Sequence, residues 1–260
     1  MSDVTTTSGP RPAPNPRRSA AAALGLLGAF ALLLAFAAHV DFDGATLGPL
    51  PVFLATVVLV AFAAVVVEGR RDFFAALGLD QPVPIAAGAG LAMAAPTLVA
   101  LWIAREPVET ALPLHLVRIA LATTLTEEIA LRGYALLTLT RRAGFRAPTA
   151  AALTMLALAA ARVATAFGHA SARELVEIGL VAAATSGWLA WLVLAWRGNL
   201  WVAIALHFGM NLAWSLFEVD THGGVAPHVG RLASVAASIA LTLAARRYVF
   251  TSSAAPSDRA

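Results

Sequence analysis

The sequence predicts an all-α polytopic integral membrane protein with about eight transmembrane helices and both termini in the cytoplasm. Of its 260 residues, 59% are hydrophobic and 13% are charged, whereas about a quarter of a soluble chain is charged. The apolar residues form runs close to the roughly 20 residues that a helix needs to cross a bilayer. The alternating ten-residue strands of a membrane barrel do not occur, so the runs predict helices.

The N-terminal segment and the first apolar run differ in composition and predict different structures. Residues 1–18 are rich in Pro, Ser and Thr and predict a disordered basic tail. Residues 19–40 follow Arg17 and Arg18, which raises the alternative of a cleaved secretion signal. The run is longer than the apolar region of such a signal, so we interpret it as a retained membrane helix.

Seven further apolar runs complete the predicted membrane domain, which spans residues 19–248 and is followed by a flexible tail at 249–260. No internal repeat or second domain is visible. The stretch from Asp72 to Pro82 predicts a short amphipathic piece at the inner surface. The seven runs are 48–67, 84–104, 113–140, 148–169, 175–196, 199–218 and 229–248.

The distribution of arginine tests the number of spans, because cytoplasmic loops are enriched in basic residues. Eight spans with a cytoplasmic N-terminus leave only four arginines toward the outer side, where acidic residues are concentrated. The arginines placed inside are Arg11, Arg17, Arg18, Arg70, Arg71, Arg141, Arg142, Arg146, Arg197, Arg246, Arg247 and Arg259.

Charged residues inside an apolar run are costly, so they are expected to be paired or functional. In the fourth run, Glu128 and Arg132 stand four residues apart, which predicts an ion pair on one helix face. Glu127 points to a neighbouring face, where it can serve as a general base. The alternative is a buried ion pair with a second acid used in helix packing.

The seventh run contributes a second polar pair. His207 and Asn211 are also four residues apart, so their side chains can converge on one point. An imidazole and an amide so placed can donate hydrogen bonds to a developing oxyanion. Hydrogen bonding between neighbouring helices is the alternative role.

The stretch EEIALRGY, from Glu127 to Tyr134, resembles the EExxxR signature of the CPBP intramembrane proteases, also called the Abi family, bacterial relatives of the CAAX prenyl endopeptidases. The segment from Gly187 to Asn211 is similar to the glycine-bearing helix, basic turn and HxxxN motif of that family. The resemblance covers about residues 114–213. It implies an intramembrane endopeptidase that hydrolyses a peptide bond of a membrane-associated or prenylated peptide.

The resemblance also implies roles for individual residues. Glu127 would activate the water, Glu128 and Arg132 would support the site, and His207 with Asn211 would stabilise the oxyanion. The family's second motif, FxxxH, has no clear counterpart here. The expected position of its histidine falls at or beside Arg162. The nearest histidine, His169, is therefore the candidate catalytic residue for this role.

The expected depths of these residues in the membrane show what the departure from the family pattern implies. Counted from the inner ends of their helices, Glu127 and Arg162 lie at about the same depth, near 20 Å, and His169 lies about 10 Å nearer the outer surface. An arginine level with Glu127 would pair with it and weaken it as a base. The alternative function is therefore a catalytically altered homologue that acts as a membrane binding or scaffold protein.

The remaining expectations concern partners, cofactors and other classes. We expect membrane lipid and a peptide or membrane-protein substrate as partners, no nucleic acid, and location in a bacterial plasma membrane. No cofactor is required and a divalent metal is left open, although cysteine and the HExxH motif are absent. Rhomboid-type and presenilin-type motifs are also absent. A small transporter remains a further alternative, although no inverted repeat supports it.

Overall fold

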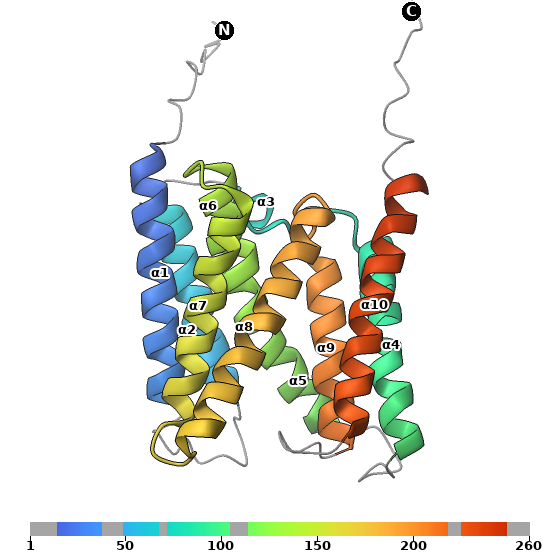
Figure 1. Cartoon of the computed structure of the whole chain (residues 1–260). Coiled ribbons are helices and arrows are strands. Elements are labelled where there is room, and N and C mark those ends of the chain that lie inside the picture. The colour runs from blue at the N-terminus through green and yellow to red at the C-terminus, as the bar shows by residue number, and fades with distance from the viewer. Residues whose placement is uncertain (1–14, 38–48, 68–71, 105–113, 218–224, 249–260) are drawn as a thin grey trace, which may run out of the picture.

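The computed structural model describes residues 15–37, 49–67, 72–104, 114–217 and 225–248, and each predicted apolar run is helical within these ranges (Figure 1). Of the predicted N-terminal tail at 1–18, residues 1–14 lie outside the described residues, as does the predicted tail at 249–260. The prediction is wrong for residues 16–18, which already belong to the first helix. The helices are α1 (Pro16–Ala37), α2 (Leu50–Ala61), α3 (Phe73–Leu77), α4 (Val83–Ala104), α5 (Leu114–Glu127), α6 (Leu137–Arg141), α7 (Ala147–Ala166), α8 (Ala172–Ala195), α9 (Trp201–Leu216) and α10 (Val225–Tyr248).

Two π-helical segments extend these helices without a break in the chain. The segment η1 (Phe62–Val67) continues α2, and η2 (Glu128–Leu136) joins α5 to α6. The fourth predicted run is therefore one helical rod in three parts. Because π-helical turns inside α-helices frequently mark functional sites, η2 draws attention to the EEIALRGY stretch that it contains.

Five helices in the described part of the chain are long and apolar enough to cross a membrane, which falls short of the predicted count of eight. They are Pro16–Ala37, Val83–Ala104, Ala147–Ala166, Ala172–Ala195 and Pro227–Arg246. Two shorter apolar helices are Leu50–Val65 and Trp201–Leu216. At 1.5 Å per residue, a 16-residue helix such as α9 spans about 24 Å, less than the hydrocarbon core.

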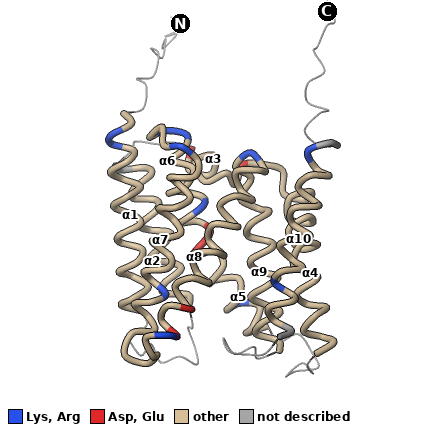
Figure 2. The backbone as a smooth tube through the Cα atoms, in the orientation of Figure 1, with Lys and Arg blue, Asp and Glu red and all other residues tan. Residues whose placement is uncertain are grey.

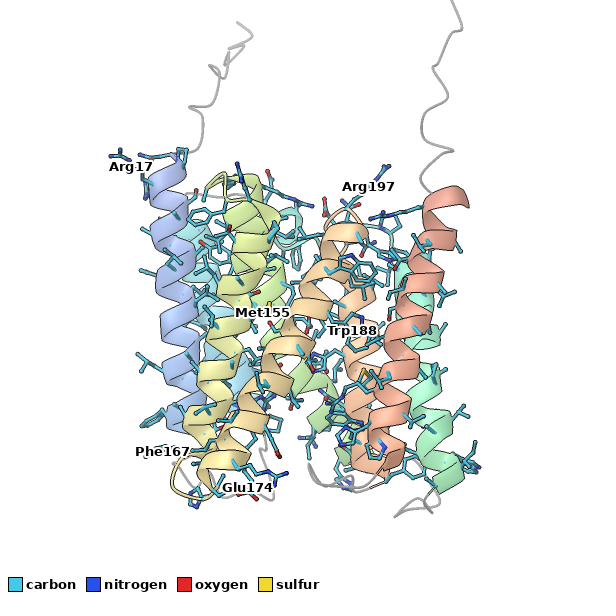
Figure 3. All side chains as sticks on the ribbon, in the orientation of Figure 1. Arg17, Met155, Phe167, Glu174, Trp188 and Arg197 are labelled. Atoms are coloured by element: carbon cyan, nitrogen blue, oxygen red, sulfur yellow. The ribbon has the colours of Figure 1, made fainter. Side chains whose placement is uncertain are left out.

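Many charged residues lie near the two ends of the bundle, and a smaller group lies in its middle (Figure 2). The start of α1 and the end of α10 lie at the same end as the turn between α8 and α9 (Figure 1). Figure 3 places Arg17 and Arg197 at this end and Glu174 at the opposite end. Among the described residues, the labelled positions Arg17 and Arg197 thus lie at one end and Glu174 at the other, as the sequence predicted.

The bundle is built from pairs of closely packed helices. Helix α4 lies between α9 and α10, α7 packs along α8 and α1, and α5 packs against α9. Small residues allow the backbones to approach: a side chain on Gly209 of α9 would collide with the Cβ atom of Ala94 on α4, at 2.7 Å. Because lipid tails are as apolar as the helices, the hydrophobic effect does not drive helices together in a membrane. Close packing at small residues contributes to their association instead.

The amphipathic stretch predicted at Asp72–Pro82 forms the short helix α3 and a turn at the basic end. It is fastened to the turn between α8 and α9 by three hydrogen bonds. The N–H of Leu200 donates to Gly78 O, the indole of Trp201 donates to Leu79 O, and Asn199 Nδ2 donates to Pro82 O. These bonds fix the start of α9, which carries His207 and Asn211.

Candidate functional site

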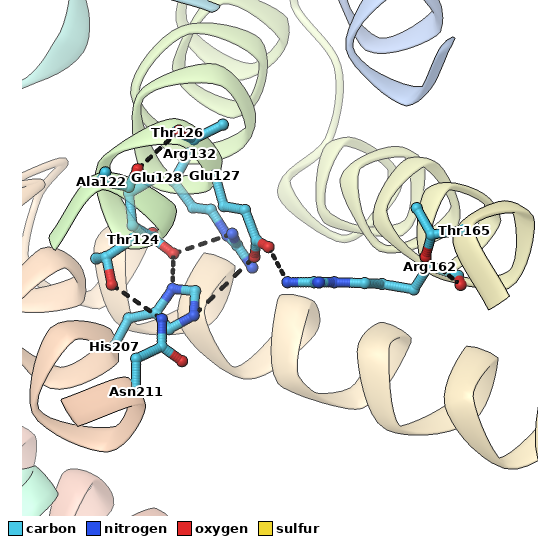
Figure 4. A network of polar contacts seen from close by, with 10 residues as sticks. All are labelled: Ala122, Thr124, Thr126, Glu127, Glu128, Arg132, Arg162, Thr165, His207 and Asn211. Carbon is cyan, nitrogen blue, oxygen red and sulfur yellow. Dashed lines mark hydrogen bonds and ion pairs between the residues drawn. The ribbon is translucent and has the colours of Figure 1, made fainter. Parts of the chain in front are cut away.

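Glu128 is the centre of a buried polar cluster (Figure 4). Its Oε1 atom accepts a hydrogen bond from Arg132 Nη1 at 3.0 Å and lies 2.7 Å from His207 Nδ1. The side chains of Glu128 and Arg132 are fully buried. The predicted i,i+4 ion pair is therefore formed, and it also contacts α9. Since Glu128 Oε1 already accepts from an arginine, we assign the proton of the Nδ1 contact to His207.

Glu127 lies between His207 and Arg162 (Figure 4). Its Oε2 atom is 4.0 Å from His207 Nε2, and its Oε1 atom accepts a hydrogen bond from Arg162 Nη2. The Glu127 side chain is only 4% exposed, whereas that of Arg162 is 43% exposed. The expected equal depth of these two residues is thus confirmed, and a cation from α7 compensates the second carboxylate.

Asn211 stands beside this cluster and is held by a threonine. Its Nδ2 atom donates to Thr124 Oγ1 at 3.1 Å, which links α9 to α5. Thr126, two residues further along, instead donates to the backbone carbonyl of Ala122 in its own helix at 2.7 Å. Of these two threonines, Thr124 therefore orients the asparagine.

The packing around Gly133 explains why the charged residues of η2 can be buried inside the bundle. Gly133 follows Arg132, and a Cβ atom there would lie 2.9 Å from Leu200 Cδ2 and 3.3 Å from Leu77 O. The glycine lets α3 and the start of α9 close over the segment. As a result, every residue from Glu128 to Leu136 is buried, and the ion pair has no access to solvent from this side.

The structure brings together five of the six residues expected from the sequence: Glu127, Glu128, Arg132, His207 and Asn211. His169 lies elsewhere. Helix α7 ends at Ala166, three residues before the predicted end, and His169 is exposed in the following turn. The helix stops because Phe167 is extended and Gly168 adopts a left-handed conformation (φ +89°).

Thr124 was missed by the sequence reasoning, although a signal for it exists. It stands four residues before Glu128, so both side chains lie on the same face of the helical rod. A hydroxyl on that face is placed to meet the HxxxN pair. Arg162, by contrast, was identified from the expected position of the missing motif histidine and from its depth.

The donor set does not fit a divalent metal. Among the described residues, no three His, Asp or Glu side chains are grouped so that they could hold a metal ion. Glu127 and Glu128 each bind an arginine. A guanidinium beside each carboxylate repels a second cation at short range. We therefore assign no chemistry to a metal.

The fold and the cluster define a class: an all-helical membrane protein with a charged polar site enclosed by its helices. A comparison with known families shows what part of the chain is similar to. Residues 109–213 match the family model described as Type II CAAX prenyl endopeptidase Rce1-like. This family consists of membrane proteases, and the match confirms the resemblance carried by EEIALRGY and HFGMN. No curated protein matches the chain significantly.

Proposed function

We propose that the protein is an intramembrane endopeptidase in which Glu127 activates the water that hydrolyses a peptide bond. One observation carries the proposal: Glu127 Oε2 and His207 Nε2 face each other at 4.0 Å. Two polar atoms at this separation can both contact one water molecule at about 2.8 Å. A base and a second polar group thus converge on the place where the attacking water would stand.

The proposed reaction follows from this placement. One O–H bond of the water breaks, its proton passes to Glu127, and the oxygen attacks the carbonyl carbon of the substrate. The proton then passes from Glu127 to the leaving nitrogen as the C–N bond breaks. A base in this role contributes about 10²- to 10⁴-fold to the rate.

Two residues of α9 are proposed to stabilise the oxyanion. His207 donates from Nε2 when it is an imidazolium, because its Nδ1 proton is held by Glu128. Asn211 uses one amide hydrogen on Thr124 and keeps a second one for the oxyanion. Glu128 and Arg132 orient His207 and do not touch the substrate.

The proposed setting is a bacterial plasma membrane. We propose eight spans with both termini in the cytoplasm, because the basic ends of α1, α6 and α10 lie at one face of the bundle. The substrate is then a peptide or membrane-protein segment that reaches the site from within the bilayer, with or without a prenyl group.

A second candidate function is favoured by the ion pair between Arg162 and Glu127. A carboxylate held by a guanidinium is a poorer base, and a site with this arrangement suits a homologue that binds a membrane peptide without cutting it. This candidate keeps the cluster as a binding site and gives up hydrolysis.

One experiment separates the two functions. The purified protein in detergent is incubated with a quenched library of apolar peptides, and cleavage is compared between wild type, Glu127→Gln and Arg162→His. Glu177→Gln serves as the control, because Glu177 is also paired with an arginine but lies exposed outside the site. We expect cleavage by the wild type and the control and none by Glu127→Gln. Cleavage that appears only in Arg162→His would establish the altered homologue.

A further inference from the structure

The cluster contains two arginines with very different access. Arg132 is fully buried and its Nη1 is bound to Glu128. The side chain of Arg162 is 43% exposed, although it covers a carboxylate that is 4% exposed. Arg162 also comes from another helix, α7, and approaches Glu127 from the side opposite His207 (Figure 4). It is therefore the cation of this cluster that a ligand can reach.

The contact between Arg162 and Glu127 leaves much of the guanidinium unused. It joins one nitrogen, Nη2, to one oxygen, Oε1. A guanidinium has five N–H donors in a planar fork and binds a carboxylate best through two parallel hydrogen bonds. Within the described ranges, this guanidinium makes no other hydrogen bond. A second carboxylate can thus approach the free donors of Arg162, and a pair of two parallel hydrogen bonds with it can replace the single bond to Glu127.

We propose that Arg162 is the receptor for a carboxylate of the ligand, and that this carboxylate takes the guanidinium away from Glu127. The inference rests on the proposed function and names a property of its substrate: an acidic group close to the bond that is cut. The group is either the α-carboxylate of a chain end or the side chain of an Asp or Glu within the membrane segment.

Charge balance explains why ligand binding and activation are coupled. The charges of Glu127 and Glu128 are cancelled by those of Arg132 and Arg162. A ligand carboxylate adds one negative charge in a medium of low dielectric constant, where an uncompensated charge is costly. When the ligand holds Arg162, Glu127 is the carboxylate left without a cation. It can then accept a proton from water, and its negative charge passes to the oxyanion that forms on the substrate.

Arg162 is thus a specificity-determining residue. In the resting protein it holds the base in an ion pair, and only a ligand with an acidic group releases it. An apolar peptide without a carboxylate leaves the pair intact and is cut slowly. The same guanidinium therefore both selects the ligand and keeps Glu127 inactive in its absence.

Binding is measured separately from cleavage. A library of apolar hexapeptides is made in three forms: as free acids, as C-terminal amides, and as amides with one internal glutamate. Each form is equilibrated with immobilised Glu127→Gln protein, which cannot turn it over, and the retained peptides are quantified by mass spectrometry. We expect free acids or glutamate amides to be retained at least about tenfold over plain amides, as a charge-assisted pair predicts. The form that is retained identifies the source of the carboxylate.

Replacements of Arg162 test the assignment. In the Glu127→Gln background, Arg162→Gln should abolish the preference for acidic peptides, whereas Arg162→Lys, which keeps the charge but not the fork, should retain part of it. Arg173→Gln is the matched control, since Arg173 also pairs with a glutamate but is 89% exposed at the outer end. Thermal unfolding verifies that each variant is folded.

The outcomes separate this inference from the proposed function. Equal retention of all three forms, or a preference that survives Arg162→Gln, overturns the inference. A preference that depends on Arg162, in a protein whose wild type cuts none of the peptides, supports the inference and contradicts the hydrolysis. Cleavage by the wild type with equal rates for acids and amides supports hydrolysis and overturns the role of Arg162.

Discussion

Arg162 Nη2 donates a hydrogen bond to Glu127 Oε1 and so joins helix α7 to the carboxylate at the end of α5. Two residues that are 35 positions apart in the chain thus meet inside the bundle. Counting 1.5 Å per residue from the short turn between α6 and α7 places both at the same depth. We therefore propose that Arg162 governs the state of Glu127.

The two arginines of the cluster should differ in their effect on stability. Arg132→Gln leaves Glu128 fully buried without its cation and should lower the free energy of unfolding by about 3–5 kcal/mol. Arg162→Gln also leaves a buried carboxylate without its cation, but Arg162 itself is partly exposed, so the cost should be smaller, about 1–3 kcal/mol. Thermal or denaturant unfolding in detergent measures both.

A double variant serves as the control for this comparison. Glu128→Gln combined with Arg132→Met removes both buried charges together and should recover most of the loss caused by Arg132→Gln alone. Equal destabilisation by Arg132→Gln and Arg162→Gln would contradict the burial difference between the two side chains.

Thr124→Val should lower the rate of cleavage by about tenfold, because Asn211 loses the hydroxyl that fixes its amide and a misplaced donor stabilises the oxyanion less. Thr126→Val is the matched control, since its hydroxyl bonds only to the backbone of its own helix. The kcat of both variants is compared on one quenched peptide. A similar loss in Thr126→Val would show that helix structure, and not Asn211, is affected.

Gly133→Ala should destabilise the fold by about 1–3 kcal/mol, because the added methyl group meets Leu200 and the backbone of Leu77. Gly88→Ala in α4 is the control, as no atom lies within 4 Å of the added carbon there. That substitution should be neutral or slightly stabilising. The free energies of unfolding of both variants are measured and compared in the same detergent. A neutral Gly133→Ala would mean that α3 does not close over η2.

The proposed topology can be mapped with single cysteines, since the chain has none of its own. Arg146→Cys at the start of α7 should react with a membrane-impermeant thiol reagent only in opened cells or inverted vesicles. Ala172→Cys at the start of α8 should react in intact cells, because a helix separates the two positions. Labelling of Arg146→Cys from outside would reverse the orientation.

The sequence alone predicted the helical segments and most of the cluster, because both depend on local spacing. The pair of Glu128 and Arg132 follows from an i,i+4 separation, and the pair of Glu127 and Arg162 follows from depth across one short turn. Helical geometry is regular enough for such arithmetic. Because of this regularity, the two ion pairs of the candidate site could be predicted without knowledge of the tertiary packing.

What could not be predicted depends on departures from regular helices. His169 was expected to continue helix α7, but Gly168 takes a left-handed conformation and carries the histidine into an exposed turn. The sequence AFGH contained this signal, since glycine commonly ends helices. The π-helical η2 and the hydrogen bond from Asn211 to Thr124 depend on packing between helices, which no local pattern encodes.

The most direct test of Glu127 as the base measures whether oxygen from water enters the product. The purified protein is incubated with its best library peptide in water enriched in ¹⁸O, and the products are analysed by mass spectrometry. We expect one ¹⁸O atom in the new carboxylate from wild type and a rate lower by at least about 10²-fold in Glu127→Gln. An undiminished yield of labelled product from Glu127→Gln would contradict the claim that Glu127 activates the water.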